Sequence, residues 1–319
     1  MIATVSHGVT RLGEARAVAD PCPSAEAIGA AAADQASGEN FPVALRLLPA
    51  RYRQRLAAVY GFARAVDDMG DEAPPGERAR LLDELEADLG RLYQFQDISL
   101  RNGAVPAPDG TGSGQPRIGV IRALAPAVAE CAIPQRPFTD LIQANRQDQV
   151  ITRYRTFDEL AGYCELSANP VGRVVLHVFG AATPDRILLS DRVCTALQLA
   201  EHWQDVAEDL ARGRIYLPAD DLARFGVTAA DLAEPAAGRA VRDLMRFETD
   251  RARQLLDQGA PLVGTLRGAA RLAVAGYLAG GRAALAAIRA QEYDVLSATA
   301  RPRKPRMAVE LAKAYVRGK

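Results

Sequence analysis

The chain has 319 residues, 39 Lys and Arg against 39 Asp and Glu, and a hydrophobic content of 49%. These values are typical of a globular protein with a sizeable core and exclude a fully disordered chain. The balanced charge argues against a nucleic-acid-binding protein, because such proteins carry a basic excess or a basic stripe. The four Cys are far apart and include no CxxC pair. We therefore expect neither a thiolate zinc site nor a disulfide framework, which fits a reducing cytoplasm.

Both ends of the chain and one internal segment lack helical patterning. Residues 1–37 are rich in Ala, contain Pro21 and Pro23, and have no basic cluster before an apolar block. We expect a poorly ordered extension there, not a secretory signal. Residues 102–116, NGAVPAPDGTGSGQP, read as a loop because Gly and Pro break helices. Residues 301–319 form a basic tail, and no segment has the 18 uninterrupted apolar residues that predict a membrane span.

Residues 38–300 read as a single all-α domain. Ala, Leu, Arg and Glu dominate this range and favour helices, whereas period-two runs of β-branched and aromatic residues are almost absent. No repeat of fixed length is visible. The predicted helices, including one in the tail, span residues 41–48, 51–70, 76–95, 117–131, 137–149, 156–166, 168–179, 184–211, 218–224, 239–258, 263–291 and 304–316.

The first chemically informative segment has the sequence YGFARAVDDMGD, residues 60–71. On a helix that turns 100° per residue, its polar side chains gather on one side and its apolar side chains on the other. Asp67 lies where the two faces meet, and a carboxylate at that margin can project into a cavity between helices. The polar side consists of Tyr60, Arg64, Asp67, Asp68 and Asp71.

The second informative segment is QLAEHWQDVAED, residues 198–209. Spacings of three, four and four place four polar residues in one line along a predicted helix. The segment RGRIYLP follows directly and adds Arg212, Arg214 and Tyr216. Arginine suits bidentate contacts with phosphate. The line itself consists of Gln198, Glu201, Asp205 and Asp209.

Carboxylates four residues apart repel each other and destabilise a bare helix. Two helices with this spacing indicate a cation that offsets the repulsion. Mg²⁺ is the natural candidate, because it prefers oxygen ligands and is commonly held by one or two carboxylates together with phosphate oxygens. Two acidic faces across a cavity would hold several Mg²⁺ ions around one diphosphate and neutralise it as a leaving group.

The competing interpretation of both acidic lines is structural. An acidic stripe on an amphipathic helix is most often a solvated face, and either line alone favours that interpretation. The two lines together, each accompanied by Arg and Tyr, favour a functional site.

A third segment, YCELSANPVG at residues 163–172, carries small side chains that suit close helix packing or a ligand. Tight packing is the better explanation for this segment alone, and Pro170 predicts a disruption of the helix. The three histidines do not form a site. We expect no catalytic role for His202, although it flanks the second acidic line.

Five motifs occur in a fixed order: YxxxRxxDDxxD from Tyr60, YCxxxAxxVG from Tyr163, QxxxxxxDxxxD from Gln198, GRIYLP from Gly213 and EYDV from Glu292. This ordered set resembles the squalene/phytoene synthase family. The resemblance covers almost the whole chain except the N-terminal extension. It implies an all-α, isoprenoid synthase-type helical bundle in which two aspartate-rich helices face each other across a central apolar cavity.

The motifs and the resemblance together assign roles to individual residues. The expected Mg²⁺ ligands are Asp67, Asp68, Asp71, Asp205 and Asp209. The expected catalytic residues are Asn40, Tyr60, Arg64, Tyr163, Glu201 and Tyr216. The expected substrate contacts are Arg64, Ala168, Val171, Gly172, Gln198, Arg214 and Tyr277. No NADPH is expected.

Within the family, the sequences ENFPVA at 39–44 and WQDV at 203–206 resemble one bacterial branch of squalene and hopanoid biosynthesis. That branch converts presqualene diphosphate and water into hydroxysqualene and diphosphate. Three departures from condensing relatives fit the release of a single diphosphate. Glu201 replaces the usual Asn, Gln204 replaces a frequent Arg, and the sequence GEN at 38–40 replaces a serine-rich stretch.

Two other functions stay open. One is the head-to-head condensation of two farnesyl diphosphates to presqualene diphosphate, squalene or dehydrosqualene. The other is a catalytically silent protein that binds isoprenoids or supports an assembly, although the retained aspartates favour catalysis. The very apolar substrate implies passage to and from a membrane. Because no spanning segment is predicted, we expect a cytoplasmic protein with at most transient contact with the surface of the inner membrane. Other enzymes of the pathway are expected partners.

Overall fold

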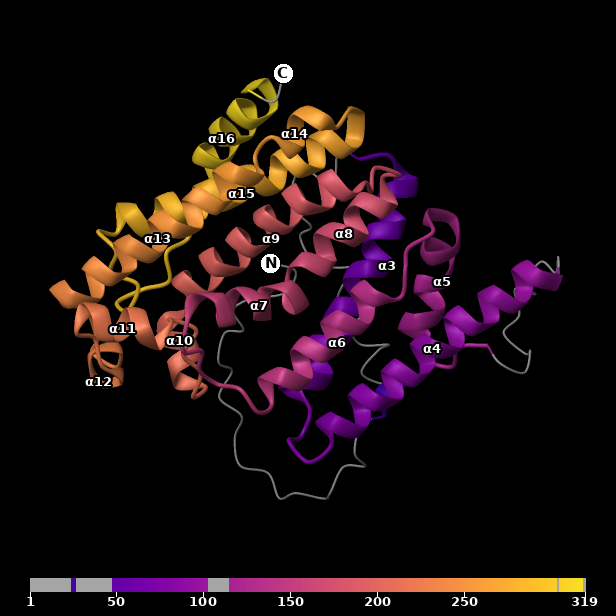
Figure 1. Ribbon diagram of the computed structural model, residues 1–319, viewed down its shortest axis with the longest axis horizontal. Coiled ribbons are helices and arrows are strands. Elements are labelled where there is room, and N and C mark those ends of the chain that lie inside the picture. The colour runs from indigo at the N-terminus through magenta and orange to yellow at the C-terminus, as the bar shows by residue number, and fades with distance from the viewer. Residues whose placement is uncertain (1–23, 27–47, 103–114, 303, 318–319) are drawn as a thin grey trace. The chain divides into compact units, whose positions relative to one another are not determined.

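The structure, a computed structural model, describes residues 24–26, 48–102, 115–302 and 304–317. Over these ranges the chain is helical, and its β structure is a single isolated bridge between Arg153 and Ile215 (Figure 1). The predicted all-α class is confirmed. Outside the described residues lie the predicted N-terminal extension except residues 24–26, the catalytic candidate Asn40, residues 41–47 of the predicted helix 41–48, and residues 103–114 of the predicted loop.

The chain forms two compact units, which are described separately. Unit 1 comprises Met1–Glu39 and Ala57–Glu130, and unit 2 comprises Asn40–Leu56 and Cys131–Lys319. In unit 1, the end of α3 (Ala50–Asp67) leads into the π-helix η1 (Asp68–Glu72). The helices α4 (Arg78–Asn102) and α5 (Gly119–Cys131) follow.

The helices of unit 1 are held by apolar packing and by one buried carboxylate. Leu81, Leu85 and Leu89 lie on one face of α4 and are fully buried. Asp88 on the same helix is also fully buried. Its carboxylate accepts hydrogen bonds from the backbone N–H groups of Arg117, at 2.8 Å, and Ile118, at 2.7 Å. Because these groups directly precede α5, Asp88 satisfies donors at the start of that helix.

Unit 2 contains the helices from α6 onward. Their order is α6 (Arg136–Asp148), α7 (Phe157–Ser167), α8 (Asn169–Val178), α9 (Pro184–Gln204), α10 (Val206–Ala211), α11 (Ala219–Phe225), α12 (Ala229–Leu232), α13 (Arg239–Gly259), α14 (Leu262–Thr265), α15 (Gly268–Ala290) and α16 (Lys304–Arg317). None of the described helices in either unit combines the length and the hydropathy that a membrane span requires.

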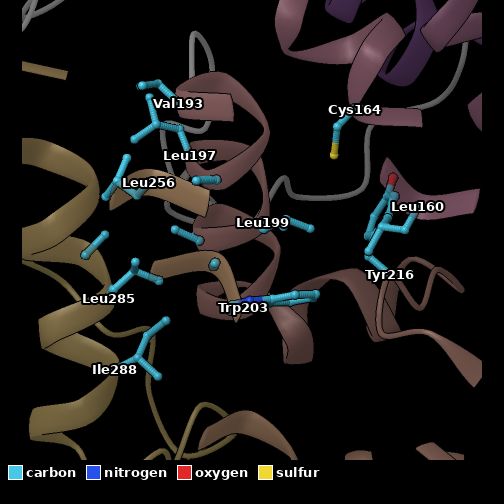
Figure 2. Close-up of a cluster of buried hydrophobic side chains, with 14 of the residues drawn as sticks. Leu160, Cys164, Val193, Leu197, Leu199, Trp203, Tyr216, Leu256, Leu285 and Ile288 are labelled. Carbon is cyan, nitrogen blue, oxygen red and sulfur yellow. The ribbon is translucent and has the colours of Figure 1, made fainter. Parts of the chain in front are cut away.

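Helix α9 is the central helix of unit 2. It packs against α7, α8, α13, α14 and α15. Figure 2 shows Val193 and Leu197 on one side of α9, toward Leu256, and Leu199 on another side, toward Leu160. A helix that is buried on several sides is a rigid support, and the second acidic line begins on this helix.

Glycines allow neighbouring helices to approach α9 closely. A Cβ atom on Gly259 of α13 would lie 2.6 Å from Val193 Cγ2 and 2.8 Å from the Leu189 carbonyl oxygen. A Cβ atom on Gly172 of α8 would lie 2.4 Å from Ser190 Oγ. Helix packing therefore accounts for Gly172, a residue that the sequence also suggests as a substrate contact.

We expect Gly259→Ala to lower the free energy of unfolding by about 1–3 kcal/mol, because the new methyl group meets the backbone of α9, which cannot move aside like a flexible side chain. Gly162→Ala on α7 is the matched control. A Cβ atom there meets nothing within 4 Å, and Ala favours the helix by up to about 1 kcal/mol. Urea unfolding of both variants measures the difference, and equal stability of the two would contradict this account.

Two predicted helices are interrupted in the structure. The predicted helix 184–211 divides into α9 and α10 at Asp205, whose φ of −108° and ψ of 17° leave the helical region. The predicted helix 263–291 divides into α14 and α15 around Leu266, which is extended, with Gly268 at φ +54°. The predicted disruption at Pro170 is confirmed, since α7 ends at Ser167 and α8 begins at Asn169.

The described part of the basic tail is a helix that packs on the core. Helix α16 lies along α15, as Figure 1 also shows. Ala314 of α16 is buried, and Arg271 of α15 donates a 2.6 Å hydrogen bond to the Tyr315 carbonyl oxygen. The predicted helix 304–316 is thus confirmed.

A half-buried guanidinium, that of Arg251, joins α11 and α13 of unit 2. Arg251 lies 2.8 Å from an oxygen of Asp221 and 3.2 Å from an oxygen of Glu248, whose side chain is fully buried. Burial raises the pKa of Glu248 to about 8, although Arg251 acts in the opposite direction. The backbone carbonyl of Glu248 also accepts a 3.1 Å hydrogen bond from the indole N–H of Trp203 on α9.

We expect the stability of the wild-type protein to fall as the pH rises from about 5 to about 8. A carboxyl group whose pKa is higher in the folded state binds its proton more tightly when folded, so its deprotonation at rising pH favours unfolding. The side chain of the Glu248→Gln variant cannot ionise. Between pH 6 and pH 9, the free energy of unfolding should therefore fall less in this variant than in the wild type, by more than about 1 kcal/mol. Urea unfolding at both values tests this, and parallel pH profiles would contradict it.

Candidate functional site

The first acidic segment lies in unit 1, where α3 widens into a π-helix. The N–H of Ala73 donates to the carbonyl of Asp68 at 3.0 Å, an i→i+5 bond. Single-turn π-helices of this kind frequently occur at functional sites. The change of helical pitch alters the 100° spacing that the sequence analysis assumed beyond Asp67. Of the three candidate ligands here, Asp67 is half-buried, Asp68 is buried and Asp71 is exposed.

Arg64 is held within this segment by two acidic side chains. Its Nε lies 2.7 Å from Asp68 Oδ1, and its Nη2 donates a 2.9 Å hydrogen bond to Glu72 Oε1. The guanidinium is buried, so it is strongly oriented by these contacts. Tyr60, one turn earlier, is half-buried. Arg64 as a diphosphate contact and Asp68 as a metal ligand stay predictions, and the structure adds Glu72 as a residue that the sequence analysis missed.

The second acidic segment lies in unit 2, around the interruption at Asp205. Glu201, Asp205, Glu208 and Asp209 are all half-buried. The N–H of Asp209 donates to the Asp205 carbonyl at 2.8 Å, so the helical spacing of these two residues survives the interruption. The candidate ligands Asp205 and Asp209 therefore remain one turn apart.

The charge of this segment favours a bound cation. Burial, followed by the negative charges of Glu201, Glu208 and Asp209, raises the pKa of Asp205 to about 7. Among the described residues, no three His, Cys, Asp or Glu side chains are grouped around a point where a metal ion could sit. The donor set nevertheless suits Mg²⁺, which one or two carboxylates can hold with substrate oxygens and water. A cation here would relieve the repulsion that raises the pKa of Asp205.

A glycine turn sets the position of Arg214 and Tyr216 after this segment. Gly213 has φ +79°, and its N–H donates to the Leu210 carbonyl while the N–H of Arg214 donates to the Asp209 carbonyl. This pair of bonds is the Schellman arrangement, in which glycine readily adopts the left-handed conformation. The following Ile215 N–H donates to the Thr152 carbonyl at 2.9 Å. This bond fixes Tyr216 beside residues 152–155. Arg214, two residues earlier, is half-buried.

A cluster of three tyrosines lies next to this turn in unit 2. The ring centroids of Tyr154, Tyr163 and Tyr216 are 5.5–6.1 Å apart. The hydroxyl of Tyr163 donates to Asp148 at 2.7 Å, and that of Tyr216 donates to the other oxygen of Asp148 at 3.3 Å. Burial raises the pKa of all three phenols, and the nearby Asp148 charge adds to this effect. The three rings are therefore closely packed, with Tyr163 and Tyr216 donating to Asp148 and Tyr154 accepting a 3.1 Å hydrogen bond from the side-chain amide of Gln147.

The remaining candidates of unit 2 lie on three helices. Gln198 is half-buried on α9, and its side chain contacts His202. Ala168 is buried at the junction of α7 and α8, and Val171 is half-buried on α8. Tyr277 lies on α15, near Cys194, and burial raises the pKa of its phenol to about 12. The structure thus groups Gln198 with the acidic segment, whereas it places Tyr277 on a separate helix.

The sequence analysis missed Tyr154 and Asp148 and set His202 aside. His202 is buried, and its ring stacks on that of Tyr216 with centroids 3.8 Å apart and an interplanar angle of 15°. Tyr154 and Asp148 precede the motif that begins at Tyr163 and share no helical line with it.

Comparisons with known proteins identify one family. The sequence model of squalene/phytoene synthase matches residues 35–308. A hydroxysqualene synthase from Sinorhizobium fredii is 33% identical over 234 residues, which cover 72% of each chain. A phytoene synthase from Arthrospira platensis is 32% identical over 274 residues, covering 81% of this chain and 82% of the relative.

Solved structures agree with these sequence matches. The crystal structure of a squalene synthase from Alicyclobacillus acidocaldarius has a TM-score of 0.70 and 39% sequence identity, and the match covers 83% of this chain and 94% of that one. A dehydrosqualene synthase structure has a TM-score of 0.73 at 24% identity and covers 92% of this chain and 98% of its own. At that identity, the second similarity supports the fold alone.

Proposed function

This chain belongs to the squalene/phytoene synthase family, and from that premise we propose that it is a Mg²⁺-dependent enzyme that acts on a prenyl diphosphate. The proposed reaction converts presqualene diphosphate and water into hydroxysqualene and diphosphate. The carbon–oxygen bond to the diphosphate breaks, water supplies the new hydroxyl group, and a proton is released. This assignment makes the protein a carbon–oxygen lyase of bacterial squalene and hopanoid biosynthesis, without a need for NADPH.

The half-buried carboxylates of the second acidic segment, in unit 2, carry the proposal. Asp205 and Asp209 would hold Mg²⁺. In unit 1, we propose that the first acidic segment also binds Mg²⁺, with Asp67, Asp68 and Asp71 as its ligands. When bound, the ion would neutralise the diphosphate as a leaving group. The raised pKa of Asp205 supports this role, because without a cation the four acids of this segment repel one another.

The tyrosine cluster would serve the hydrocarbon part of the substrate. The hydroxyls of Tyr163 and Tyr216 are engaged by Asp148, so the phenols are held in place and do not act as nucleophiles. The negative faces of the rings can stabilise the positive charge that develops as diphosphate leaves. Arg64, Arg214 and Gln198 are proposed diphosphate contacts, and Tyr60 is a proposed catalytic residue on the first acidic segment.

Glu201 or Asn40 would place the water that captures the cation. Glu201 is half-buried on the same helix face as Asp205, and Asn40 lies outside the described residues. The Glu201→Asn and Asn40→Ser variants test this role. Continued formation of the tertiary alcohol alone, at the normal rate, in both variants would rule it out.

One further observation favours the release of a single diphosphate. Gln204 occupies the position where condensing relatives often have Arg, and its side-chain amide donates to the carbonyl of Ala300 instead of adding a cation to the acidic segment. We therefore propose that this segment accommodates fewer phosphate groups than a site that condenses two prenyl diphosphates.

We also propose a cytoplasmic location with at most transient contact with the inner-membrane surface and with other enzymes of the pathway.

Head-to-head condensation of two farnesyl diphosphates is the second candidate, because phytoene synthases match this chain about as closely as hydroxysqualene synthases do. Incubation with presqualene diphosphate alone, or with farnesyl diphosphate alone, separates the two reactions. We expect hydroxysqualene from the first substrate, detected by mass spectrometry, and no product when EDTA removes the cation. Products from farnesyl diphosphate would favour condensation, and no product from either would favour a catalytically silent protein.

A further inference from the structure

His202 lies between two polar residues of the second acidic segment. It is located on α9, and its side chain is 8% exposed. Its Nε2 lies 3.1 Å from the side-chain nitrogen of Gln198, one turn earlier. Its Nδ1 lies 3.7 Å from Asp209 Oδ2, beyond the interruption at Asp205. The imidazole thus connects the two ends of the acidic segment.

The contact with Gln198 favours the tautomer of the ring in which Nε2 accepts a hydrogen bond and Nδ1 carries the proton. The side-chain nitrogen of Gln198 can only donate a hydrogen bond, which makes Nε2 of His202 its acceptor. In this tautomer, the proton of the neutral imidazole is on the nitrogen that faces Asp209. At 3.7 Å, Nδ1 and Asp209 Oδ2 are about 0.5 Å beyond the usual range of a hydrogen bond and within the range of an ion pair.

The ring plane of His202 is fixed by a second set of contacts. The imidazole stacks on Tyr216, and the Tyr216 hydroxyl donates to Asp148. Tyr163 lies on the other side of this group and donates to the same carboxylate. Because the stacking and the Gln198 contact restrict both the plane and the rotation of the ring, Nδ1 is held facing Asp209.

We propose that His202 is a positioning residue that holds the Asp209 carboxylate in the orientation in which it binds the divalent cation. The inference rests on the proposed function only in taking Asp209 as a metal ligand. One oxygen of Asp209 receives the Nδ1–H bond, which leaves the other oxygen directed to the ion. Groups that donate a hydrogen bond to a metal-binding carboxylate typically change metal affinity 10–100-fold.

Three substitutions separate positioning from packing. His202→Asn can place its amide N–H where Nδ1–H was and still donate to Asp209. His202→Gln extends its amide toward the former Nε2 position, and His202→Phe retains the ring that stacks on Tyr216 without either nitrogen. Mn²⁺ binding, followed by electron paramagnetic resonance of the full-length protein with inorganic diphosphate present, measures affinity without catalysis. Urea unfolding in EDTA shows whether each variant is folded.

We expect His202→Asn to bind Mn²⁺ within about threefold of the wild type, whereas His202→Gln and His202→Phe lose about tenfold or more. Equal affinities in all three folded variants, whether normal or reduced, would overturn the proposal. A wild type that binds no Mn²⁺ would overturn both this inference and the Mg²⁺ dependence. If the three variants bind Mn²⁺ as expected but the wild type forms no hydroxysqualene, the role of His202 is supported and only the proposed reaction is refuted.

Discussion

Asp205→Asn is expected to reduce diphosphate release from presqualene diphosphate by at least about a thousandfold, which corresponds to about 4 kcal/mol of transition-state stabilisation. The substitution keeps the size of the side chain but removes a charge that Mg²⁺ needs. Because burial, followed by the neighbouring acids, raises the pKa of Asp205, a neutral amide at this position should leave the folded protein as stable as the wild type, or more so, without metal. Rate and stability should therefore move in opposite directions. Coupled detection of released diphosphate at saturating Mg²⁺, with urea unfolding in EDTA, measures both.

Glu208→Gln is the matched control. Glu208 lies on α10, which begins directly after Asp205, and its charge also raises the pKa of Asp205. Its side chain, however, accepts a 3.2 Å hydrogen bond from the Thr299 hydroxyl and lies off the line of Glu201, Asp205 and Asp209. We expect its rate to stay within about tenfold of the wild type. Similar losses in both variants would show that the total charge of the segment matters and that Asp205 is not a specific ligand.

The helices could be predicted from the sequence because their periodicity is local. The ends of α6, α7, α8 and α13 differ from the predicted limits by at most one residue. The interruption at Asp205 could not be predicted in this way, because HWQDVAED contains neither Gly nor Pro and reads as continuous helix. The side chain of Gln204 bonds to the Ala300 carbonyl at this point, a contact that depends on a segment nearly a hundred residues away.

The candidate site was predictable where spacing along one helix defines it, as for Asp205 and Asp209. It was not predictable where distant segments meet. Tyr154 and Asp148 join Tyr216 because residues 152–155 pair with the turn after α10, and an isolated bridge has no periodic signature. Sequence reasoning set His202 aside because a lone histidine on a helix is usually structural. Its partners become evident only when Tyr216 is placed against its ring.

Arg251→Met is expected to cost about 3–5 kcal/mol of folding free energy, the largest effect on stability that we predict. The guanidinium is the cation nearest to Asp221, which is only 8% exposed, and its loss leaves a buried carboxylate without compensation. It also lies over the rings of Phe157, at 4.2 Å, and Phe247, at 4.5 Å, and methionine cannot replace these cation–π contacts. Chemical denaturation at pH 7 measures the loss.

Two further variants distinguish the loss of the Arg251 charge from a general effect on α13. Arg253→Met removes an arginine two residues later whose 3.0 Å pair with Asp250 is about half exposed, so we expect a loss below about 1 kcal/mol. Asp221→Asn in the Arg251→Met background should recover part of the stability, because the uncompensated charge is then gone. If the double variant is as unstable as Arg251→Met, the contribution of Arg251 comes from its packing on the two phenylalanine rings and not from its charge.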